Sequence, residues 1–372
     1  MLSLLLAAAI SQTALPLNIG GHVAPAPAGG YDFGWPGVYF EGRFTGASVE
    51  VAVDTGAEHL AISIDGVRKA ELTKSGATRL KLDGLGPGEH VVRLDKLTES
   101  QVGSARFEGF YVDKGRALPA PVRPRRIEFI GDSHTVGYGV RSASRDCTES
   151  QVHDLTDTSL AFGPILASRL DADYRIVAFS GRGVVRNYNG VAAGQSLPTL
   201  FPRLIPGQDA PRVAANDPWK PDVVVIGLGT NDFSTPVQSG EAWADEGALR
   251  TAYREAYVAF VQGLKVSRPE ARFFLIAGDT FDADVAEVAQ QAGATAVRIT
   301  GMDRGACHWH PSVADQRMMA ERLEAAIRAT PSPTAASRVA RPSAARRAAS
   351  PPPAASRPSA GEVRSDPAPA AR

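Results

Sequence analysis

The sequence lacks the short motifs that mark several common enzyme classes. It has no G-x-x-x-x-G-K-[ST] segment for a P-loop nucleotide site, and no H-E-x-x-H segment or dense cluster of His, Asp and Glu for a metal ion. The G-x-S-x-G elbow of the standard α/β-hydrolases is also missing. Residues 181–190 are rich in glycine, but their spacing does not match a dinucleotide fingerprint. We therefore predict that the protein uses neither a metal nor another cofactor.

An excess of charge of one sign and long apolar runs are lacking as well. Lys plus Arg and Asp plus Glu both number 40. Seven Arg, against one Glu and one Asp, lie in residues 331–372. No aromatic residue accompanies these arginines to stack on bases, so no nucleic-acid site is expected.

The chain begins with a short apolar run over residues 1–14, which is too brief to span a bilayer. Such a run is typical of the core of a signal peptide, and we expect residues 1–20 to be a signal-like segment. The alternative is a buried first strand or helix. No other run is long enough for a membrane span, so we expect the mature protein to be soluble. The signal-like segment then predicts a secreted or periplasmic location.

Cysteine is scarce, with only Cys147 and Cys307 in the chain. If the protein is exported, the two can form a disulfide between two loops near the candidate site described below. The alternative is a pair of unpaired thiols.

Two folding patterns divide the chain. Residues 30–115 contain short stretches of alternating polar and apolar residues between turn signals, which predicts a β-sandwich or jelly-roll domain. Residues 116–125 form a Pro-rich linker. Over residues 126–330 strands alternate with helices, which predicts a parallel sheet with helices on both faces. Residues 331–372 have little to bury and are expected to be disordered.

Individual strands and helices can be predicted within residues 126–330. The expected strands are 126–130, 174–179, 222–228, 272–277 and 296–299. The main expected helices are 159–170, 244–266 and 312–329. Residues 223–226 are apolar on both faces, as a central parallel strand should be. Ser312 is expected to cap the last helix.

A serine directly after the first of these strands is the candidate nucleophile. Ser133 lies in the run Gly-Asp-Ser-His-Thr, at the strand end where an open α/β sheet presents reactive groups. A serine hydroxyl needs an adjacent base. His310, which precedes Pro311 at the entry to the last helix, is the expected base. His308 is the alternative base, because residues i and i+2 of an extended segment point the same way.

Ester hydrolysis also needs hydrogen-bond donors for the developing oxyanion. The candidates are the side-chain amide of Asn231 and the backbone N–H groups of Gly181 and Ser133. Gly183 is the alternative to Gly181, and an Asx turn is the alternative role for Asn231.

The group that orients the base is not obvious, because no carboxylate lies within three residues before His310. Asp303 and Asp315 are possible partners. A main-chain carbonyl could instead fix the imidazole tautomer, and we favour this Ser-His dyad.

The candidate segments resemble those of the SGNH (GDSL-type) hydrolase superfamily. The matching residues are Gly131-Asp132-Ser133, Gly181, Gly229-Thr230-Asn231-Asp232 and His310-Pro311. In wider context, residues 131–139, 180–184 and 308–312 resemble carbohydrate esterase family two, the acetylxylan esterases, and residues 35–38 and 107–110 are similar to motifs of its N-terminal sandwich. The superfamily's usual Asp three residues before the histidine is Cys307 here.

This resemblance covers residues 30–328 and implies an SGNH-type three-layer α/β/α domain preceded by a jelly roll. It implies a secreted serine esterase that removes acetyl groups from plant-wall poly- or oligosaccharides, such as xylan or mannan, through an acetyl-serine intermediate. Trp309 is then expected to bind substrate by stacking on a sugar ring; otherwise it would be a core aromatic residue. The alternatives are an SGNH esterase or lipase for another acyl ester, and a non-catalytic carbohydrate-binding protein.

Overall fold

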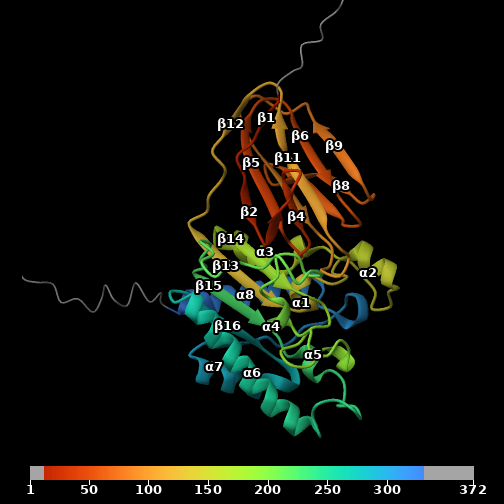
Figure 1. The fold of residues 1–372 in the computed structure, drawn as a ribbon, viewed down its shortest axis with the longest axis vertical. Helices are drawn as coiled ribbons and strands as arrows, with labels where there is room; N and C mark the ends of the chain where they lie inside the picture. The colour runs from red at the N-terminus through yellow and green to blue at the C-terminus, as the bar shows by residue number, and fades with distance from the viewer. Residues whose placement is uncertain (1–11, 331–372) are drawn as a thin grey trace, which may run out of the picture. The chain divides into compact units, whose positions relative to one another are not determined.

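The computed structural model describes residues 12–330 and arranges their strands in three sheets (Figure 1). Most of the expected signal-like segment and the whole of the expected disordered tail lie outside the described residues. Within residues 12–330, no helix has both the length and the apolar character needed to cross a membrane.

The N-terminal region is an all-β domain of two antiparallel sheets, whose strands Figure 1 draws in red to orange. The strands are β1 (Thr13–Ala14), β2 (Asn18–Gly20), β3 (Val23–Pro25), β4 (Tyr31–Phe33), β5 (Tyr39–Thr45), β6 (Val49–Asp54), β7 (Leu60–Ile64), β8 (Val67–Leu72), β9 (Ala77–Leu82), β10 (Glu89–Lys96), β11 (Ala105–Val112) and β12 (Arg116–Leu118). One sheet has the order β3-β4-β11-β6-β9, with β1 paired to β11. The other has the order β12-β5-β10-β7-β8, with β2 paired to β5.

A β-bulge shapes the core between these two sheets. The register of β11 against β6 shifts between Phe107 and Gly109. Since strand residues alternate between faces, the extra residue lets Phe107 and Phe110, three positions apart, both point inward. Both are fully buried, and Phe107 stacks on Phe40 of the opposite sheet with ring centroids 4.2 Å apart. Gly109 has φ 148°, which favours glycine at the bulge.

The second region contains a five-stranded parallel sheet of order β14-β13-β15-β16-β17. Its strands are β13 (Arg125–Gly131), β14 (Ala172–Ala178), β15 (Val223–Gly227), β16 (Arg272–Ala277) and β17 (Thr295–Arg298). The helices are α1 (Ser133–Val136), α2 (Glu149–Leu155), α3 (Phe162–Arg169), α4 (Leu197–Leu200), α5 (Thr230–Phe233), α6 (Glu246–Ser267), α7 (Asp282–Ala292) and α8 (Val313–Ala329), with the 3-10 turns η1 (Thr158–Leu160), η2 (Tyr188–Gly190), η3 (Asp279–Phe281) and η4 (Cys307–Trp309). The predicted helix over 159–170 is divided, because Ala161 is extended between η1 and α3.

Helices cover both faces of this sheet. Ile127 and Phe129 of β13 pack in one buried cluster with residues of α3 and α8. Ile130, on the opposite face of the same strand, packs in a second cluster with residues of α6 and α7. In Figure 1, α6 and α7 lie together on one side of the sheet. The predicted α/β/α domain and the preceding all-β domain are therefore both confirmed.

The strand order also determines where a site can form. The first strand of this sheet in the sequence, β13, is an inner strand. The next strand, β14, pairs with one edge of β13, and β15 pairs with the other edge. In open α/β sheets, the crevice beyond the carboxyl ends of the strands at such a reversal is the usual binding site. Ser133 and Asn231 directly follow the two strands that flank the reversal.

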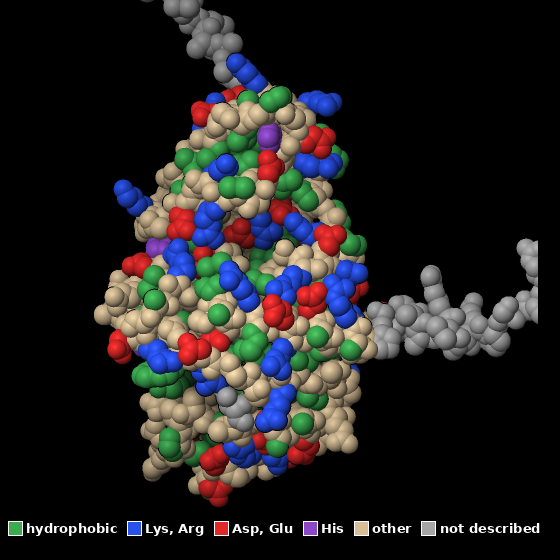
Figure 2. Space-filling model, turned by 180° about the vertical axis from the view of Figure 1, so that it is seen from behind, with side chains coloured by type: hydrophobic (Ala, Val, Ile, Leu, Met, Phe, Trp, Pro, Cys, Tyr) green, Lys and Arg blue, Asp and Glu red, His purple; other side chains and the backbone are tan. Residues whose placement is uncertain are grey.

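The two domains meet through buried polar contacts as well as apolar ones. The Trp35 indole N–H donates to the Arg203 carbonyl at 3.0 Å, and the Tyr39 hydroxyl donates to Asp173 at 2.8 Å. The Arg123 guanidinium contacts Asp173 at 2.8 Å and Glu41 at 2.7 Å. Figure 2 shows basic and acidic side chains side by side across the middle of one face of the molecule.

A buried ion pair lies in the β domain next to this junction. Lys96 Nζ lies 2.8 Å from the Glu58 carboxylate, and neither side chain is exposed. The same ammonium donates to the carbonyl oxygens of Thr98 and Glu99, at 2.7 and 2.9 Å. All of these partners come from two loops that would otherwise carry unpaired polar groups in the interior, so the lysine ties the loops together.

We predict that Lys96→Met lowers the free energy of unfolding by about 3–5 kcal/mol, because it leaves the buried Glu58 carboxylate without its cation. Denaturant unfolding followed by circular dichroism measures this change. The control is Lys81→Met, which removes a pair with Asp113 whose lysine side chain is 48% exposed, and we expect it to leave the free energy of unfolding nearly unchanged. Equal losses in the two variants would contradict the prediction.

Candidate active site

Ser133 begins a single helical turn immediately after β13. Asp132 caps this turn by accepting a hydrogen bond from the His134 N–H at 3.0 Å, and Gly137 ends it in the left-handed conformation. A side chain at Gly131 would lie 2.0 Å from Thr135 Oγ1, so only glycine allows the helix to start this close to the strand. The sharp turn places the Ser133 hydroxyl at the carboxyl edge of the sheet.

His310 contacts this serine, although the two residues lie far apart in the sequence. Its Nε2 lies 2.8 Å from Ser133 Oγ, across 177 positions of sequence. Its Nδ1 lies 2.9 Å from the main-chain oxygen of Cys307. A carbonyl oxygen only accepts hydrogen bonds, so Nδ1 carries the proton and Nε2 keeps its lone pair toward the serine hydroxyl. This is the tautomer that a general base needs.

The two carboxylates considered as orienting groups have other roles. Asp315 accepts hydrogen bonds from the N–H groups of Asp303, Arg304 and Ser312, each at 2.9 Å. It also completes a capping box with Ser312 at the start of α8, where Ser312 is the predicted cap. Asp303 is an exposed residue that lies 3.6 Å from Arg145. The position that a carboxylate fills in a triad is taken by the Cys307 carbonyl.

His308, the alternative base, does not contact Ser133 in the structure. Its Nδ1 lies 2.9 Å from the Tyr138 hydroxyl, and its Nε2 lies 2.8 Å from the Cys147 carbonyl. The Tyr138 ring in turn stacks on His310, with centroids 4.1 Å apart. His308 therefore supports the wall against which His310 packs.

Burial dominates the electrostatics of His310 and lowers its pKa to about 4. The bond to the Cys307 carbonyl raises this pKa in part, whereas the nearby His308 and Arg304 lower it further. An ordinary histidine titrates near 6.5. The imidazole thus stays neutral, and able to accept a proton, over most of the acidic range.

We predict that kcat/KM for an acetyl ester falls only when the pH drops through about 4, because that is where His310 takes up a proton in the folded enzyme. A titration from pH 3 to 8 measures the acid limb. The same shift makes the free energy of unfolding decrease as pH falls from about 6.5 to 4, since the unfolded state binds the proton first. Circular dichroism at each pH restricts the fit to folded enzyme. An acid limb near 6.5 would contradict the assignment.

Asn231 follows β15 at the second position of α5, next to Ser133's strand. Its amide nitrogen donates to Asp132 Oδ2 at 3.2 Å and to the Arg182 carbonyl at 3.0 Å. Both amide protons are thus engaged, and donation to a bound oxyanion requires the exchange or sharing of one of these bonds. Gly229, with φ 135°, lets the backbone before Asn231 pass close to the Phe281 ring, because a side chain at this position would lie 2.6 Å from that ring.

Of the two glycine candidates after β14, Gly181 is the more open. It has φ 79°, and a side chain placed there would meet no atom within 4 Å. The Gly183 N–H instead donates to Asn187 Oδ1 at 3.3 Å, and a side chain there would lie 2.1 Å from the Arg186 carbonyl. Gly183 therefore serves the packing of its own loop, which leaves Gly181 as the better candidate donor.

Two residues that shape this loop were missed by the sequence analysis. Asp232 accepts hydrogen bonds from the N–H groups of Val184, Val185 and Arg186, at 2.9 to 3.0 Å. Its burial raises its pKa to about 6, against the effect of these three bonds. The matched Gly-Thr-Asn-Asp run contains this residue and could have indicated its importance.

The second missed residue is Glu99, which comes from the β domain. Its Oε1 accepts a hydrogen bond of 2.5 Å from Ser180 Oγ, directly before Gly181. Its neighbour Ser100 donates to the Ala178 carbonyl at the end of β14 at 2.6 Å. Burial raises the pKa of Glu99 to about 7. No local pattern marks Glu99 in the sequence, because its role depends on a contact between domains.

The loop that carries the histidines has an unusual backbone. His308 and Trp309 have φ values of 52° and 59°, in the left-handed region. Non-glycine residues held there typically cost about 1–3 kcal/mol each and cluster at functional sites. Trp309 is 61% exposed, so it is not a core residue. An exposed indole beside the base can offer its face to a substrate.

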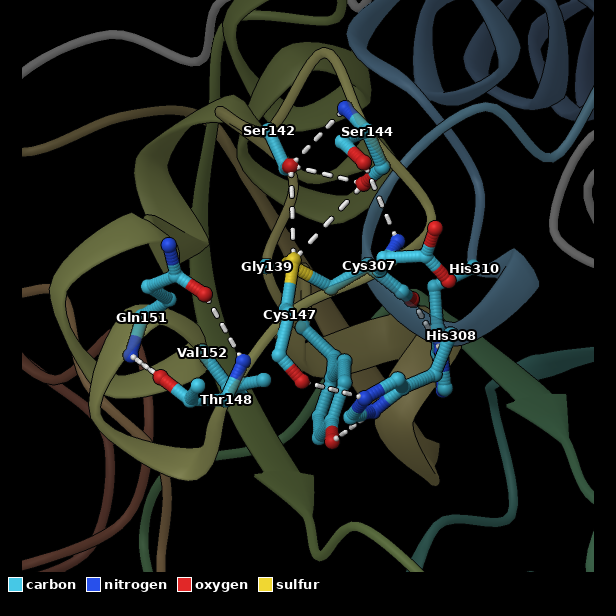
Figure 3. The surroundings of a disulfide bond; sticks show 12 residues. Gly139, Ser142, Ser144, Cys147, Thr148, Gln151, Val152, Cys307, His308 and His310 are labelled. Atoms are coloured by element: carbon cyan, nitrogen blue, oxygen red, sulfur yellow. Dashed lines mark hydrogen bonds between the residues drawn. A yellow bond between two sulfur atoms is a disulfide. The ribbon is translucent and has the colours of Figure 1, made fainter.

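A disulfide joins this loop to the segment that follows the serine (Figure 3). The expected pairing of Cys147 with Cys307 is present, with Cα atoms 5.4 Å apart. The His308 N–H donates to the Arg145 carbonyl at 2.7 Å, so main-chain bonds accompany the covalent link.

One grouping within residues 12–330 could hold a metal ion. His59, His153 and Asp154 each offer a ligand atom, and these atoms lie within 4.8 Å of one another. His59 lies more than 90 positions before the adjacent pair His153 and Asp154, so no spacing motif indicates the group. None of the three belongs to the Ser133–His310 pair, and their cluster stands apart from the predicted chemistry.

Comparison with known proteins identifies both domains. The family model for the carbohydrate esterase 2 N-terminal domain matches residues 19–121, and the model for GDSL-like lipase/acylhydrolase matches residues 127–323. An acetylxylan esterase/glucomannan deacetylase from Cellvibrio japonicus is 42% identical over 338 residues, which are 87% of this chain and 93% of that protein. The chain belongs to carbohydrate esterase family two. It is a carboxylic ester hydrolase.

Other relatives match most of the chain. The cellulase/esterase CelE of Acetivibrio thermocellus is 30% identical over 79% of this chain, which spans only 37% of that longer protein. A solved carbohydrate esterase is 38% identical with a TM-score of 0.77, covering 86% of this chain and 98% of its own. A family two carbohydrate esterase from Clostridium thermocellum, solved with cellohexaose, is 29% identical with a TM-score of 0.75, covering 84% and 98%.

Proposed function

We propose that this family two esterase removes acetyl groups from plant-wall polysaccharides, with Ser133 as nucleophile and His310 as base. The observation that carries the assignment is the 2.8 Å contact between Ser133 Oγ and His310 Nε2, with the other imidazole nitrogen bound to a carbonyl. The substrate class is supported by the relative named acetylxylan esterase/glucomannan deacetylase.

The reaction starts when Nε2 of His310 takes the proton from Ser133 Oγ while Oγ attacks the acetyl carbonyl carbon. The imidazolium that forms keeps its Nδ1–H bond to the Cys307 oxygen, whose partial negative charge stabilises it. His310 then gives the proton to the departing sugar oxygen, which leaves an acetyl group on Ser133. Water, deprotonated by the same imidazole, attacks this ester, releases acetate and restores the serine.

The tetrahedral intermediates place negative charge on the former carbonyl oxygen. We assign the Ser133 N–H, the Gly181 N–H and the Asn231 amide as its donors. Loss of one such donor typically costs about 2.7–4 kcal/mol of transition-state stabilisation. Asn231 and the loop of Gly181 are linked through the Arg182 carbonyl, which keeps the two donors in a fixed relation.

Action on a wall polysaccharide requires that the enzyme reach the outside of the cell. The apolar run over residues 1–14 supports export. The disulfide supports it as well, because such bonds form and persist mainly in oxidising compartments. We therefore propose a secreted or periplasmic location.

We predict that Ser133→Ala lowers kcat for p-nitrophenyl acetate by about 10³-fold or more, because the acetyl-serine intermediate cannot form. A burst and steady-state assay, together with a thermal melt, measures activity and folding. The matched control is Ser234→Ala, an exposed serine that follows α5, which should keep wild-type rates. Equal rates in wild type and Ser133→Ala would reject the esterase mechanism and favour a binding protein.

The substrate class has its own test on the wild-type enzyme. Acetate release from acetylated xylan and glucomannan, compared with turnover of long-chain p-nitrophenyl esters, separates polysaccharide deacetylation from a lipase-like activity. Faster turnover of the long-chain esters would overturn the assignment of substrate but not that of the dyad.

We predict that Trp309→Ala raises KM for acetylated polysaccharide roughly 5- to 30-fold, since a lost aromatic contact is worth about 1–2 kcal/mol. KM for p-nitrophenyl acetate, which is too small to occupy a sugar subsite, should change less than about twofold. Trp309→Phe is the control, because it keeps an aromatic face at the same position. Identical KM changes for the two substrates would show that Trp309 acts on the loop rather than on the sugar.

A further inference from the structure

We propose that the Cys147–Cys307 disulfide is a positioning element of the dyad, which holds the Cys307 carbonyl against Nδ1 of His310. The inference rests on the proposed function, because it concerns the same base. In this arrangement the disulfide fulfils the orienting role for which a triad uses a carboxylate.

The first step of the argument is connectivity. Cys307 provides both the oxygen that binds His310 Nδ1, at 2.9 Å, and a sulfur atom bonded to Cys147. Cys147 belongs to the segment between α1, which starts with Ser133, and α2. The group that orients the base is thus covalently tied to the segment that follows the nucleophile.

The second step is packing. A side chain at Gly139 would lie 2.5 Å from Cys307 Cβ and 2.7 Å from its sulfur, so the turn after α1 lies directly against the disulfide. Gly139 has φ 53°, and its N–H donates to Thr156 Oγ1 at 2.9 Å. Figure 3 shows Gly139, Cys147 and Cys307 close together, with His308 and His310 beside them. Cys307 itself is fully buried.

The third step is the backbone next to Cys307. The orientation of the peptide plane between residues 307 and 308, and hence of the Cys307 carbonyl, depends on the φ angle of His308. That angle is 52°, and the next residue, Trp309, has φ 59°. If His308 relaxed to the common negative φ, the peptide plane would rotate and turn the carbonyl away from His310. A strained turn of this kind persists only where its surroundings hold it.

Several non-covalent contacts assist the disulfide, and all come from the segment that it anchors. The His308 N–H donates to the Arg145 carbonyl at 2.7 Å, and its imidazole contacts the Cys147 carbonyl at 2.8 Å. The Arg145 guanidinium donates to the carbonyls of Asp303 and Arg304, both at 2.9 Å. Loss of the disulfide should therefore weaken the orientation of His310 without abolishing it.

The test is the double variant Cys147→Ala/Cys307→Ala. We expect kcat for p-nitrophenyl acetate to fall about 10- to 100-fold, while KM stays within about twofold, because substrate contacts are kept and only the base is disordered. The matched control is Ser142→Ala. Ser142 Oγ lies 3.4 Å from Cys147 Sγ and has no assigned part in the reaction, so this variant should keep the wild-type kcat.

A merely structural disulfide would not alter the base, so the imidazole itself provides the second readout. In the wild type, ¹⁵N NMR should show His310 in the Nδ1–H tautomer; in the double variant we expect a mixture of tautomers. We also expect the acid limb of kcat/KM to move from about 4 toward 6.5 as burial of the ring is relieved. The groups that face the ring from neighbouring elements are Ser133, His134, Tyr138, Arg304 and His308.

Reduction of the native enzyme keeps the test valid if the double variant does not fold. A water-soluble phosphine converts the disulfide to two thiols and is itself oxidised to the phosphine oxide. We expect a fall in kcat of similar size, reversed when the disulfide is reformed, with the circular dichroism spectrum unchanged. An unchanged kcat and tautomer after verified loss of the disulfide would overturn the proposal. Failure of the proposed function itself would appear differently, as an activity that does not depend on Ser133.

Discussion

The hydrogen bond from Nδ1 of His310 to the Cys307 carbonyl is the interaction on which the site depends. It fixes the proton on one ring nitrogen and so leaves the other free to accept from Ser133. A carbonyl is a weaker partner for an imidazolium than a carboxylate, because it carries only a partial charge. Burial further disfavours the charged ring, as the lowered pKa of His310 shows. The stacked Tyr138 ring helps to fix the plane of the imidazole.

The β domain contacts the loop that carries part of the candidate site. Through Glu99 and Ser100 it contacts the end of β14 and the loop that carries Gly181. The same loop is held from the other side by Asp232. The candidate oxyanion donor therefore sits between two carboxyl side chains that belong to different domains, and each is kept in place by its own buried network.

Much of this arrangement was predictable from the sequence, because it depends on local order. The strands β13 to β17 coincide with the predicted strands to within two residues, and Ser312 caps α8 as expected. The proximity of Ser133 and His310 follows from motif order at the carboxyl edge of a parallel sheet. The role of Glu99 was not predictable in the same way, and although a main-chain carbonyl partner for His310 was expected, the sequence did not indicate that Cys307 supplies it. The first depends on how two domains dock, and the second on a backbone angle that the residue type of His308 disfavours.

The contact of Trp35 with Arg203 has a consequence for how such enzymes are inherited. An indole from one domain that donates to the main chain of the other cannot be satisfied by a foreign neighbour with a different loop. Recombination that separated the two domains would leave the Trp35 N–H without an acceptor on one product and the Arg203 carbonyl without its donor on the other. The two domains should therefore be inherited together, and they should enter larger multidomain proteins as one unit.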